Sequence, residues 1–505
     1  MKKGKVCLVG AGPGRADLIT VRGAEVLKAA DSVIYDRLAN PALLKFARKD
    51  AEIIHTPKRI GSASCMQEEI NKLLVEKASG GKTVVRLKGG DPCIFGRCTE
   101  ELAALADAGI DFEIVPGVTA AIAAAGYTGI MLTDRDYSSQ VVFVTGREAP
   151  GKQESNIDWD LLAKFSGTIV FYMAVGNLDF IAEQLIKNGM KEDTPAAVIA
   201  DVTLPSQRMV KASLRLVADK CKQEKIEPPA IVILGPTAGG TETGFNWFMK
   251  KSLFGKSIVV TRDAPGNANF AAKIIQHGGN PIEFATIELK PLTNGDGFLQ
   301  TLAKISEYDW VIFTSANGVN IFFDALRNLQ KDSRVFGSAK IAAIGSETAA
   351  KLGEFGIRPD FVPSLFTSKE LAGQLIDFTN LQGKNISLLR SVPASRELAE
   401  LLEQAKAKVD DVAVYSTLAV KGEYEQLIRD IAAGAIDWVT FASPSAVRGF
   451  FEQIPDDLVN SSDVKVASIG PVTSDELKNF GIKVNVQATE HTIDGLLAAM
   501  EGTCE

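Results

Sequence analysis

Glycine-rich turns follow apolar runs at three places in the first half of the chain. The first, Gly10-Ala11-Gly12-Pro13-Gly14, comes directly after residues 5–9. Glycine has no Cβ, so the backbone of such a turn can lie against a ligand. Pro13 and Asp17 distinguish this turn from the Gly-x-Gly-x-x-Gly turn that leads straight into a helix and holds a dinucleotide pyrophosphate. By itself it leaves two interpretations open, a nucleotide-type cofactor and a tight structural turn.

Two further turns have the same character. Lys88-Gly89-Gly90-Asp91-Pro92 comes after residues 83–87, and Pro116-Gly117-Val118-Thr119-Ala120 comes after residues 112–115. The Asp91 carboxylate could accept a hydrogen bond from the amine or hydroxyl of a ligand. The last turn opens an alanine-rich stretch, whose small side chains leave room for a flat or bulky group. The turns together indicate a binding site built from loops.

The elements that must position these turns are short apolar runs that alternate with amphipathic stretches. The runs expected to be strands in the first half are 5–9, 32–35, 83–87, 112–115, 141–145, 168–172, 196–200 and 230–234. This alternation predicts an α/β fold with a largely parallel sheet, whose ligands gather at the carboxyl ends of the strands. After the first turn, a helix is expected to begin only past Thr20.

Length and composition limit the function classes. A chain of 505 residues predicts three or four domains of ordinary size. With 55 basic and 62 acidic residues, a net charge of −7 gives no reason to expect a nucleic-acid partner. Six cysteines without a Cys-x-x-Cys pair and three histidines predict no metal site. No apolar run is long enough for a signal peptide or a membrane span, so we expect a cytoplasmic protein.

Taken in order, the motifs of residues 4–235 resemble the uroporphyrinogen-III C-methyltransferases of the tetrapyrrole methylase family. The resemblance rests on Val9 to Gly14 with Asp17-Leu18-Ile19-Thr20, on Tyr35-Asp36-Arg37-Leu38, on Arg86 to Pro92 with Phe95-Gly96-Arg97, and on Pro116 to Ala120. It implies two α/β lobes with S-adenosyl-L-methionine between them. The implied reaction transfers two methyl groups to uroporphyrinogen III and gives precorrin-2, toward sirohaem or cobalamin.

The resemblance also assigns residues. The implied cofactor contacts are Pro13, Gly89, Gly90, Asp91, Ile94, Thr119, Ala120 and Met173. Asp36 matches the family's proton acceptor and Lys58 its proton donor, although Asp36 could merely cap a turn and Lys58 could be a solvated charge. Cationic side chains are needed for the substrate carboxylates, because guanidinium grips carboxylate bidentately. The candidates are Arg59, Arg97 and Arg135, with surface ion pairs as the alternative.

The chain departs from the family pattern at three positions. Asp134 and Arg147 stand where histidine is usual, and Val202 stands near a position where glycine is usual. These departures concern the fit of substrate and adenine more than the class of reaction.

Residues 236–255 are expected to be a linker, because 235–244 are rich in turn formers. The second half then repeats itself. Residues 309–319 (DWVIFTSANGV) return as 437–447 (DWVTFASPSAV), and residues 341–348 (IAAIGSET) return as 466–473 (VASIGPVT). The repeat predicts two similar α/β lobes that face each other across a cleft.

This second half resembles uroporphyrinogen-III synthase over residues 250–505. The resemblance includes Leu388-Leu389-Arg390, Val414-Tyr415-Ser416-Thr417 and Thr492-Ile493-Asp494-Gly495-Leu496. It implies a Rossmann-like α/β lobe of residues 256–290 plus 420–505, a second lobe of 291–419, and two crossovers between them. The implied substrate is hydroxymethylbilane, which is closed into a ring with its last pyrrole inverted.

In this half, Tyr415 is the candidate catalytic residue, because its phenol could assist the leaving hydroxyl. An ordinary half-buried strand residue is the alternative. The hydroxyl groups that could bind the carboxylate arms of the substrate belong to Ser315, Ser346, Ser443, Ser445 and Thr473. Loop capping is the alternative for the serines.

The sequence as a whole predicts a bifunctional enzyme with S-adenosyl-L-methionine as co-substrate and no metal. Hydroxymethylbilane and uroporphyrinogen III are the expected substrates, and the first half is expected to form a homodimer. Two alternatives stay open. The first half could be a later corrin-ring methylase, or one half could be a binding module without catalysis.

Overall fold

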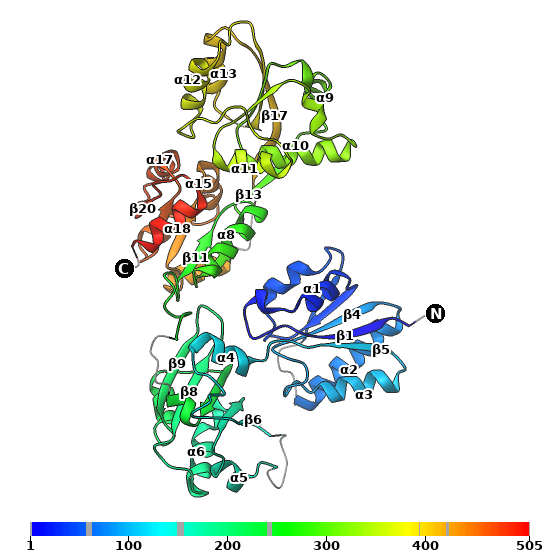
Figure 1. The fold of residues 1–505 in the computed structure, drawn as a ribbon, viewed down its shortest axis with the longest axis vertical. Coiled ribbons are helices and arrows are strands. Elements are labelled where there is room, and N and C mark those ends of the chain that lie inside the picture. Colours follow the sequence, from blue (N-terminus) through cyan, green and yellow to red (C-terminus); the bar gives the residue numbers. More distant parts are fainter. Residues whose placement is uncertain are drawn as a thin grey trace. The chain divides into compact units, whose positions relative to one another are not determined.

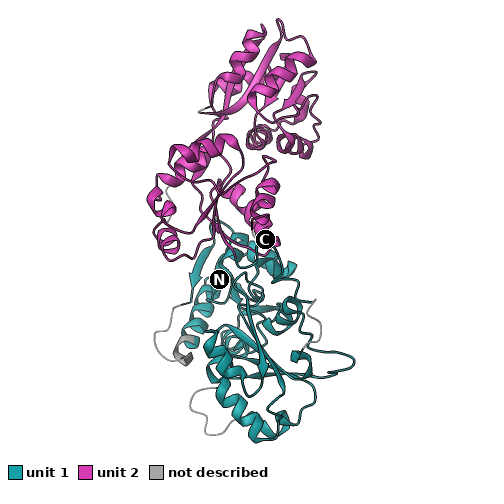
Figure 2. Ribbon diagram, turned by 90° about the vertical axis from the view of Figure 1, so that its left-hand side faces the viewer, with its two compact units in different colours: residues 1–255 teal, residues 256–505 magenta. Residues whose placement is uncertain are grey.

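A computed structural model describes residues 3–56, 63–148, 156–239, 245–392, 394–420 and 424–503. The chain divides into two compact units, 1–255 and 256–505 (Figures 1 and 2). Each unit contains two five-stranded sheets. None of the helices in these described ranges is both long and apolar enough to cross a bilayer.

The first lobe of unit 1 is a parallel sheet with the strand order β3-β2-β4-β1-β5. Its strands are β1 (Lys5–Gly10), β2 (Ser32–Tyr35), β3 (Glu52–His55), β4 (Thr83–Lys88) and β5 (Asp111–Val115), and its helices are α1 (Val21–Lys28), α2 (Ala63–Ser79) and α3 (Cys98–Asp107). Because successive side chains of a strand point to opposite faces, Cys7 and Val9 pack with α1, whereas Val6 and Leu8 pack with α2 and α3. Figure 1 shows α1 on one face of this sheet and α2 and α3 on the other. Thr20 caps α1, as predicted.

The second lobe of unit 1 has the strand order β6-β7-β10-β8-β9. It comprises α4 (Ala120–Thr128), β6 (Val141–Thr145), α5 (Trp159–Ala163), β7 (Thr168–Tyr172), α6 (Leu178–Lys187), β8 (Pro195–Ala200), β9 (Arg208–Ser213), α7 (Val217–Gln223) and β10 (Ala230–Leu234). Only β6 and β7 among these neighbours are parallel. The prediction of a largely parallel sheet is therefore wrong for this lobe, because a short loop without a helix joins β8 to β9.

Unit 2 also has two lobes. The first, with strand order β12-β11-β18-β19-β20, is parallel throughout. It contains β11 (Ser257–Val260), α8 (Ala264–Gln276), β12 (Asn280–Glu283), α14 (Tyr424–Ala432), β18 (Trp438–Phe441), α15 (Pro444–Phe451), α16 (Asp456–Asn460), β19 (Lys465–Ser468), α17 (Pro471–Asn479), β20 (Val486–Gln487) and α18 (Ile493–Glu501).

The second lobe of unit 2 has the strand order β13-β17-β16-β14-β15. It contains β13 (Ile287–Pro291), α9 (Asp296–Ala303), β14 (Trp310–Phe313), α10 (Ala316–Asn328), β15 (Lys340–Ala343), α11 (Ser346–Glu354), α12 (Ser368–Phe378), β16 (Asn385–Val392), α13 (Glu397–Gln404) and β17 (Lys408–Ala419). Since β13 pairs with β17, the chain crosses between lobes before Ile287, a few residues earlier than the sequence suggested.

The sequence repeat of unit 2 is also a structural repeat. β14 leads into α10 as β18 leads into α15, and the caps are equivalent. Ser315 accepts a hydrogen bond from the Gly318 N–H, and Ser443 accepts one from the Ala446 N–H. Each serine thereby satisfies one of the free N–H groups at the start of its helix.

Residues 245–255, expected to be part of a linker, belong to unit 1 and pack against it. Phe248 is 1% exposed, and its ring lies 4.8 Å from the ring of Tyr127 in α4. The Trp247 Nε1 donates a hydrogen bond to the Gly126 carbonyl oxygen at 2.8 Å. Aromatic burial of this size stabilises a fold, so this segment is a structural part of the first unit.

We expect Phe248→Ala to lower the free energy of unfolding of unit 1 by about 4 kcal/mol, because it leaves a large cavity. Differential scanning calorimetry of the full chain should show the midpoint of that unit's transition falling by about 10 °C. Phe245→Ala is the control, because Phe245 is 52% exposed and its removal should cost about 1 kcal/mol or less. Equal effects of the two variants would contradict the packing described.

Candidate functional site

The carboxyl ends of β1, β4 and β5 meet at three glycines whose backbones touch. A Cβ on Gly117 would lie 2.3 Å from the Gly90 carbonyl oxygen and 2.8 Å from the Gly10 Cα. A Cβ on Gly10 would lie 2.6 Å from the Gly117 Cα. Side chains do not fit at such distances, so the three predicted turns form one continuous backbone surface.

Asp91 connects these loops through hydrogen bonds. Its Oδ2 accepts a hydrogen bond from the Gly117 N–H at 2.9 Å, and its Oδ1 accepts one from the Cys93 N–H at 2.8 Å. Gly12 and Gly90 exchange two backbone hydrogen bonds, which join the first turn to the second. The sequence predicted that Asp91 faces a ligand. In the structure both carboxylate oxygens of Asp91 accept hydrogen bonds from backbone N–H groups. A carboxylate oxygen has further lone pairs, so each can also accept from another donor.

Thr119 links the first lobe to the second. Its Oγ1 lies 2.8 Å from the hydroxyl of Tyr172, the last residue of β7, and the Ala121 N–H donates to that same hydroxyl at 3.3 Å. Burial raises the pKa of the Tyr172 phenol, which keeps it neutral. Met173 follows with a left-handed φ of 55° and is 51% exposed. The Thr119–Tyr172 contact thus places the start of α4, with Ala120, beside the residue that precedes Met173.

The first turn also touches the second lobe. The Arg15 N–H donates to the Thr203 Oγ1 at 3.0 Å, and a Cβ on Gly14 would lie 2.8 Å from the Val202 carbonyl oxygen. Pro13 lies in this contact region. Val202 is 5% exposed and packs in the core of the second lobe. The side chain that departs from the family pattern therefore occupies the core.

Asp36 lies one residue beyond β2, beside the glycine loop. Its Oδ1 accepts a hydrogen bond from the Leu38 N–H at 3.0 Å, and its Oδ2 lies 3.4 Å from the Arg86 Nη2. A Cβ on Gly89 would lie 2.6 Å from the Leu38 Cβ, so the Asp36 turn rests on that loop. Asp36 does cap its turn, and its second oxygen faces a buried cation. Lys58 and Arg59 lie outside the described residues.

A buried ionic cluster was missed by the sequence reasoning. Arg86 and Lys88 of β4 both contact Glu101 of α3, at 3.1 Å and 2.7 Å. A signal was present, because two charges at i and i+2 interrupt an otherwise apolar strand and point to one face. Their partner on α3 could not be identified from the sequence.

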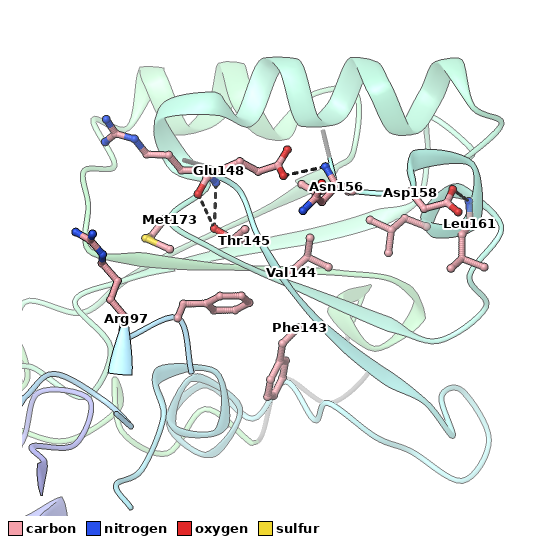
Figure 3. A pocket seen from close by; sticks show the side chains of 13 residues that line it. Arg97, Phe143, Val144, Thr145, Glu148, Asn156, Asp158, Leu161 and Met173 are labelled. Atoms are coloured by element: carbon pink, nitrogen blue, oxygen red, sulfur yellow. Dashed lines mark hydrogen bonds between the residues drawn. The ribbon is translucent and has the colours of Figure 1, made fainter. Parts of the chain in front are cut away.

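A cavity of about 620 Å³ lies beside Arg97 and Met173 (Figure 3). It is lined by Phe95, Arg97, Phe143, Val144, Thr145, Arg147, Glu148, Asn156, Ile157, Asp158, Leu161, Leu162 and Met173. Arg97 makes a bidentate ion pair with Glu100 at 2.7 Å and 2.6 Å while its exposed side chain reaches the cavity wall. Ile94 packs against the core of the second lobe.

Two residues of the loop between α4 and β6 lie outside this network of contacts. Arg135 is exposed, and Asp134 accepts hydrogen bonds from the N–H groups of Asp136 and Tyr137 at 2.9 Å and 3.2 Å. Asp134 thus shapes a local turn.

In unit 2 the structure brings Tyr415 and Ser315 together. The Tyr415 hydroxyl lies 3.0 Å from the Ser315 Oγ, which also caps α10. Tyr415 is 6% exposed, more buried than the sequence suggested. It pairs with Ser391 directly after a shift of register between β16 and β17, at Arg390 and Ser391.

The other predicted hydroxyl groups are placed as follows. The Ser443 Oγ lies 3.0 Å from the Ser445 Oγ, and both serines are half-buried. Thr473 is buried within α17, whereas Ser346 is exposed at the first position of α11. In the described part of the chain, no group of three or more metal-ligating side chains converges.

Comparisons with known proteins agree with both halves. The family model for tetrapyrrole (corrin/porphyrin) methylases matches residues 5–218, and the model for uroporphyrinogen-III synthase HemD matches residues 268–498. The porphyrin biosynthesis protein HemD of Ruminiclostridium josui is 38% identical over 497 residues, which cover 98% of this chain and 97% of that protein.

Two further similarities concern the first half. The S-adenosyl-L-methionine-dependent uroporphyrinogen III methyltransferase of Methanosarcina barkeri is 46% identical over 232 residues, 46% of this chain and 91% of that protein. A crystal structure of uroporphyrin III C-methyl transferase from Thermus thermophilus is 36% identical, covers 47% of this chain and 99% of its own, and has a TM-score of 0.41.

The first unit is thus a tetrapyrrole methylase, and the second has the α/β lobes of a uroporphyrinogen-III synthase. The chain belongs to the family of fused porphyrin-biosynthesis proteins in which a uroporphyrinogen-III C-methyltransferase half precedes a HemD synthase half.

We expect Gly117→Ala to lower the free energy of unfolding by about 2 kcal/mol, because the new Cβ meets backbone that cannot move aside. Hydrogen exchange should show that the amide of residue 117 loses protection. Gly126→Ala is the matched control in α4, since its Cβ would meet nothing within 4 Å. That variant should be stabilised by about 0.5–1 kcal/mol. A neutral Gly117→Ala would show that the loops are not held as described.

Proposed function

We propose that the second half closes hydroxymethylbilane to uroporphyrinogen III and that the first half methylates this product twice. The methyl donor would be S-adenosyl-L-methionine, the cofactor named for the Methanosarcina relative. The observation that carries the proposal is the backbone surface at Gly10, Gly90 and Gly117, which the Thr119–Tyr172 contact connects to the second lobe. Precorrin-2 would be the product, on the route to sirohaem or cobalamin.

The residues of unit 1 fit a sulfonium methyl donor. When bound, the donor supplies an electrophilic methyl group, and the chain has mainly to align it with a pyrrole carbon. The glycine surface gives close backbone approach, and Thr119, Ala120 and Met173 adjoin it. Methylation of a substituted pyrrole carbon leaves a cation that must lose a proton to a placed base. Asp36 is the carboxylate at this edge of the sheet, and two contacts fix its orientation.

The residues of unit 2 fit ring closure. Closure expels water from the hydroxymethyl arm, and the Tyr415 hydroxyl, in contact with Ser315, would donate a hydrogen bond to that leaving oxygen. The capping serines and Thr473 would hold carboxylate arms through hydroxyl groups. Fusion of the halves raises the local concentration of the shared intermediate. We further propose that the protein acts as a homodimer through its first half.

The proposal is tested by giving the full chain hydroxymethylbilane and methyl-labelled S-adenosyl-L-methionine without oxygen. We expect a tetrapyrrole with two labelled methyl groups by mass spectrometry. Unmethylated uroporphyrinogen III would contradict the methylase half and favour a later corrin-ring enzyme or a binding module. Formation of the type I isomer alone would contradict the synthase half.

Tyr415→Phe should slow ring closure by a factor of about ten to a hundred, because the phenol that assists the leaving hydroxyl is lost. The formation of uroporphyrinogen III, separated from the type I isomer by chromatography, measures this rate. Tyr308→Phe is the control in the same lobe, because its buried hydroxyl bonds to Asp410 instead. It should leave the rate unchanged, and a Tyr415→Phe enzyme of normal rate would remove the assignment.

A further inference from the structure

The buried face of the first sheet carries four charged groups in one chain of contacts. Arg86 and Lys88 continue the face on which Val84 packs with α2 and α3, and Glu101 of α3 lies between them. The side chains of Arg86, Lys88 and Glu101 are 4%, 5% and 0% exposed. Asp36 completes the chain at the edge of the site, with its side chain 28% exposed.

The guanidinium of Arg86 is shared among three acceptors. Nε donates to the Glu101 Oε1 at 3.1 Å, Nη1 to the Leu87 carbonyl oxygen at 3.2 Å, and Nη2 to the Asp36 Oδ2 at 3.4 Å. The last distance is long for a charge-assisted hydrogen bond, which is normally about 2.7–2.9 Å. Glu101 is therefore the principal anion for Arg86, and Asp36 is a secondary one.

Glu101 is itself fully engaged. Its Oε2 accepts from the Lys88 Nζ at 2.7 Å, and its Oε1 also accepts from the Gln67 Nε2 of α2 at 3.2 Å. Each of these bonds fixes the carboxylate between the two cations. In a buried setting a charge that is so placed acts strongly on its neighbours, because little water screens it.

We propose that Glu101 is a positioning residue for methylation, which keeps Asp36 basic by drawing the charge of Arg86 away from it. This inference rests on the proposed role of Asp36 as the proton acceptor. A base held in a tight arginine pair is poor, because the pair stabilises its ionised form. With Glu101 in place, Arg86 orients Asp36 without neutralising it.

Among the other described groups near this cluster, the Glu100 carboxylate of α3 interacts with Lys88 and pairs with Arg97. Tyr35 adjoins Asp36 and carries His55 of β3 against its ring, and the Cys98 thiol of α3 lies near Lys88 and Glu101. Burial raises the pKa of Cys98 to about 11, so that thiol stays neutral. Burial likewise lowers the pKa of Lys88, while Glu101 opposes that effect. Lys88 and Glu101 are thus the charges to vary.

Two substitutions should move the pH profile of methylation in opposite directions. Glu101→Gln leaves the charges of Arg86 and Lys88 uncompensated, which stabilises ionised Asp36. The acid limb, meaning the low-pH side of the plot of kcat against pH, should then move to lower pH by roughly one unit. Lys88→Met removes one cation, so the Glu101 charge compensates Arg86 alone. The acid limb should then move to higher pH. The rate is measured with uroporphyrinogen III and labelled S-adenosyl-L-methionine, and KM for both should change little.

The matched control is Glu52→Gln on β3 of the same sheet. Glu52 also bridges two lysines, Lys77 and Lys82, at 2.6 Å and 2.7 Å, but its side chain is 39% exposed. Its removal should leave the acid limb in place, because water screens the change.

Opposite shifts cannot arise from partial unfolding, which lowers activity without reversing sign. If Glu101→Gln does not fold, Lys88→Met decides alone. An acid limb that stays in place in the variants that fold, or that moves in the same direction in both, would overturn the inference. Asp36→Asn separates it from the proposed function. If the Asp36→Asn enzyme methylates normally, both the proposed role of Asp36 and the inference about Glu101 are wrong. If Asp36→Asn is inactive but the Glu101 and Lys88 variants keep the wild-type pH profile, only the inference about Glu101 is wrong.

Discussion

The first unit depends on the contact of three backbones without side chains, at Gly10, Gly90 and Gly117. A Cβ on Gly10 or on Gly117 would lie under 3 Å from backbone atoms of another loop. The Asp91 carboxylate holds the crossing together through two N–H groups. Since Thr119 follows Gly117 by two residues, the same crossing sets where the first lobe meets Tyr172 of the second. A surface that spans both lobes is therefore a consequence of glycine packing at the end of one sheet.

Stability alone does not call for an ionic cluster behind this surface. Burying a charge costs several kcal/mol, and well-packed apolar side chains in its place are often as stable. The strand that holds Arg86 and Lys88 is apolar at Val84, Val85 and Leu87 and could have stayed so. The cost is offset here by pairing, and Asp36 is the most exposed of the four groups, with 28% of its side chain exposed. The contacts thus lead from the buried residues Glu101 and Lys88 to the more exposed Asp36, which favours an electrostatic role of the cluster over a structural one.

The local features of the fold could be predicted from the sequence. Apolar runs before glycine turns predicted β1, β4 and β5, a helix was predicted to begin after Thr20, and the repeat predicted two equivalent lobes in the second half. Features that depend on distant partners could not be predicted. Strands β3 and β9 were missed, since β3 alternates between half-buried and exposed residues and β9 has a single buried residue. The burial of Phe248 depends on Tyr127, far away in the sequence.

The repeat in the second unit also predicts local features but not the contacts between distant residues. It predicts that Ser315 and Ser443 occupy equivalent positions, and in the structure both cap equivalent helices. It does not predict their partners, because Tyr415 approaches Ser315 from β17, whereas Ser443 meets Ser445 on its own helix. The two lobes therefore share their hydroxyl caps but differ in the phenol. A linear tetrapyrrole has many carboxylate arms and one hydroxymethyl group, so repeated hydroxyl groups with a single phenol match the chemistry of its closure.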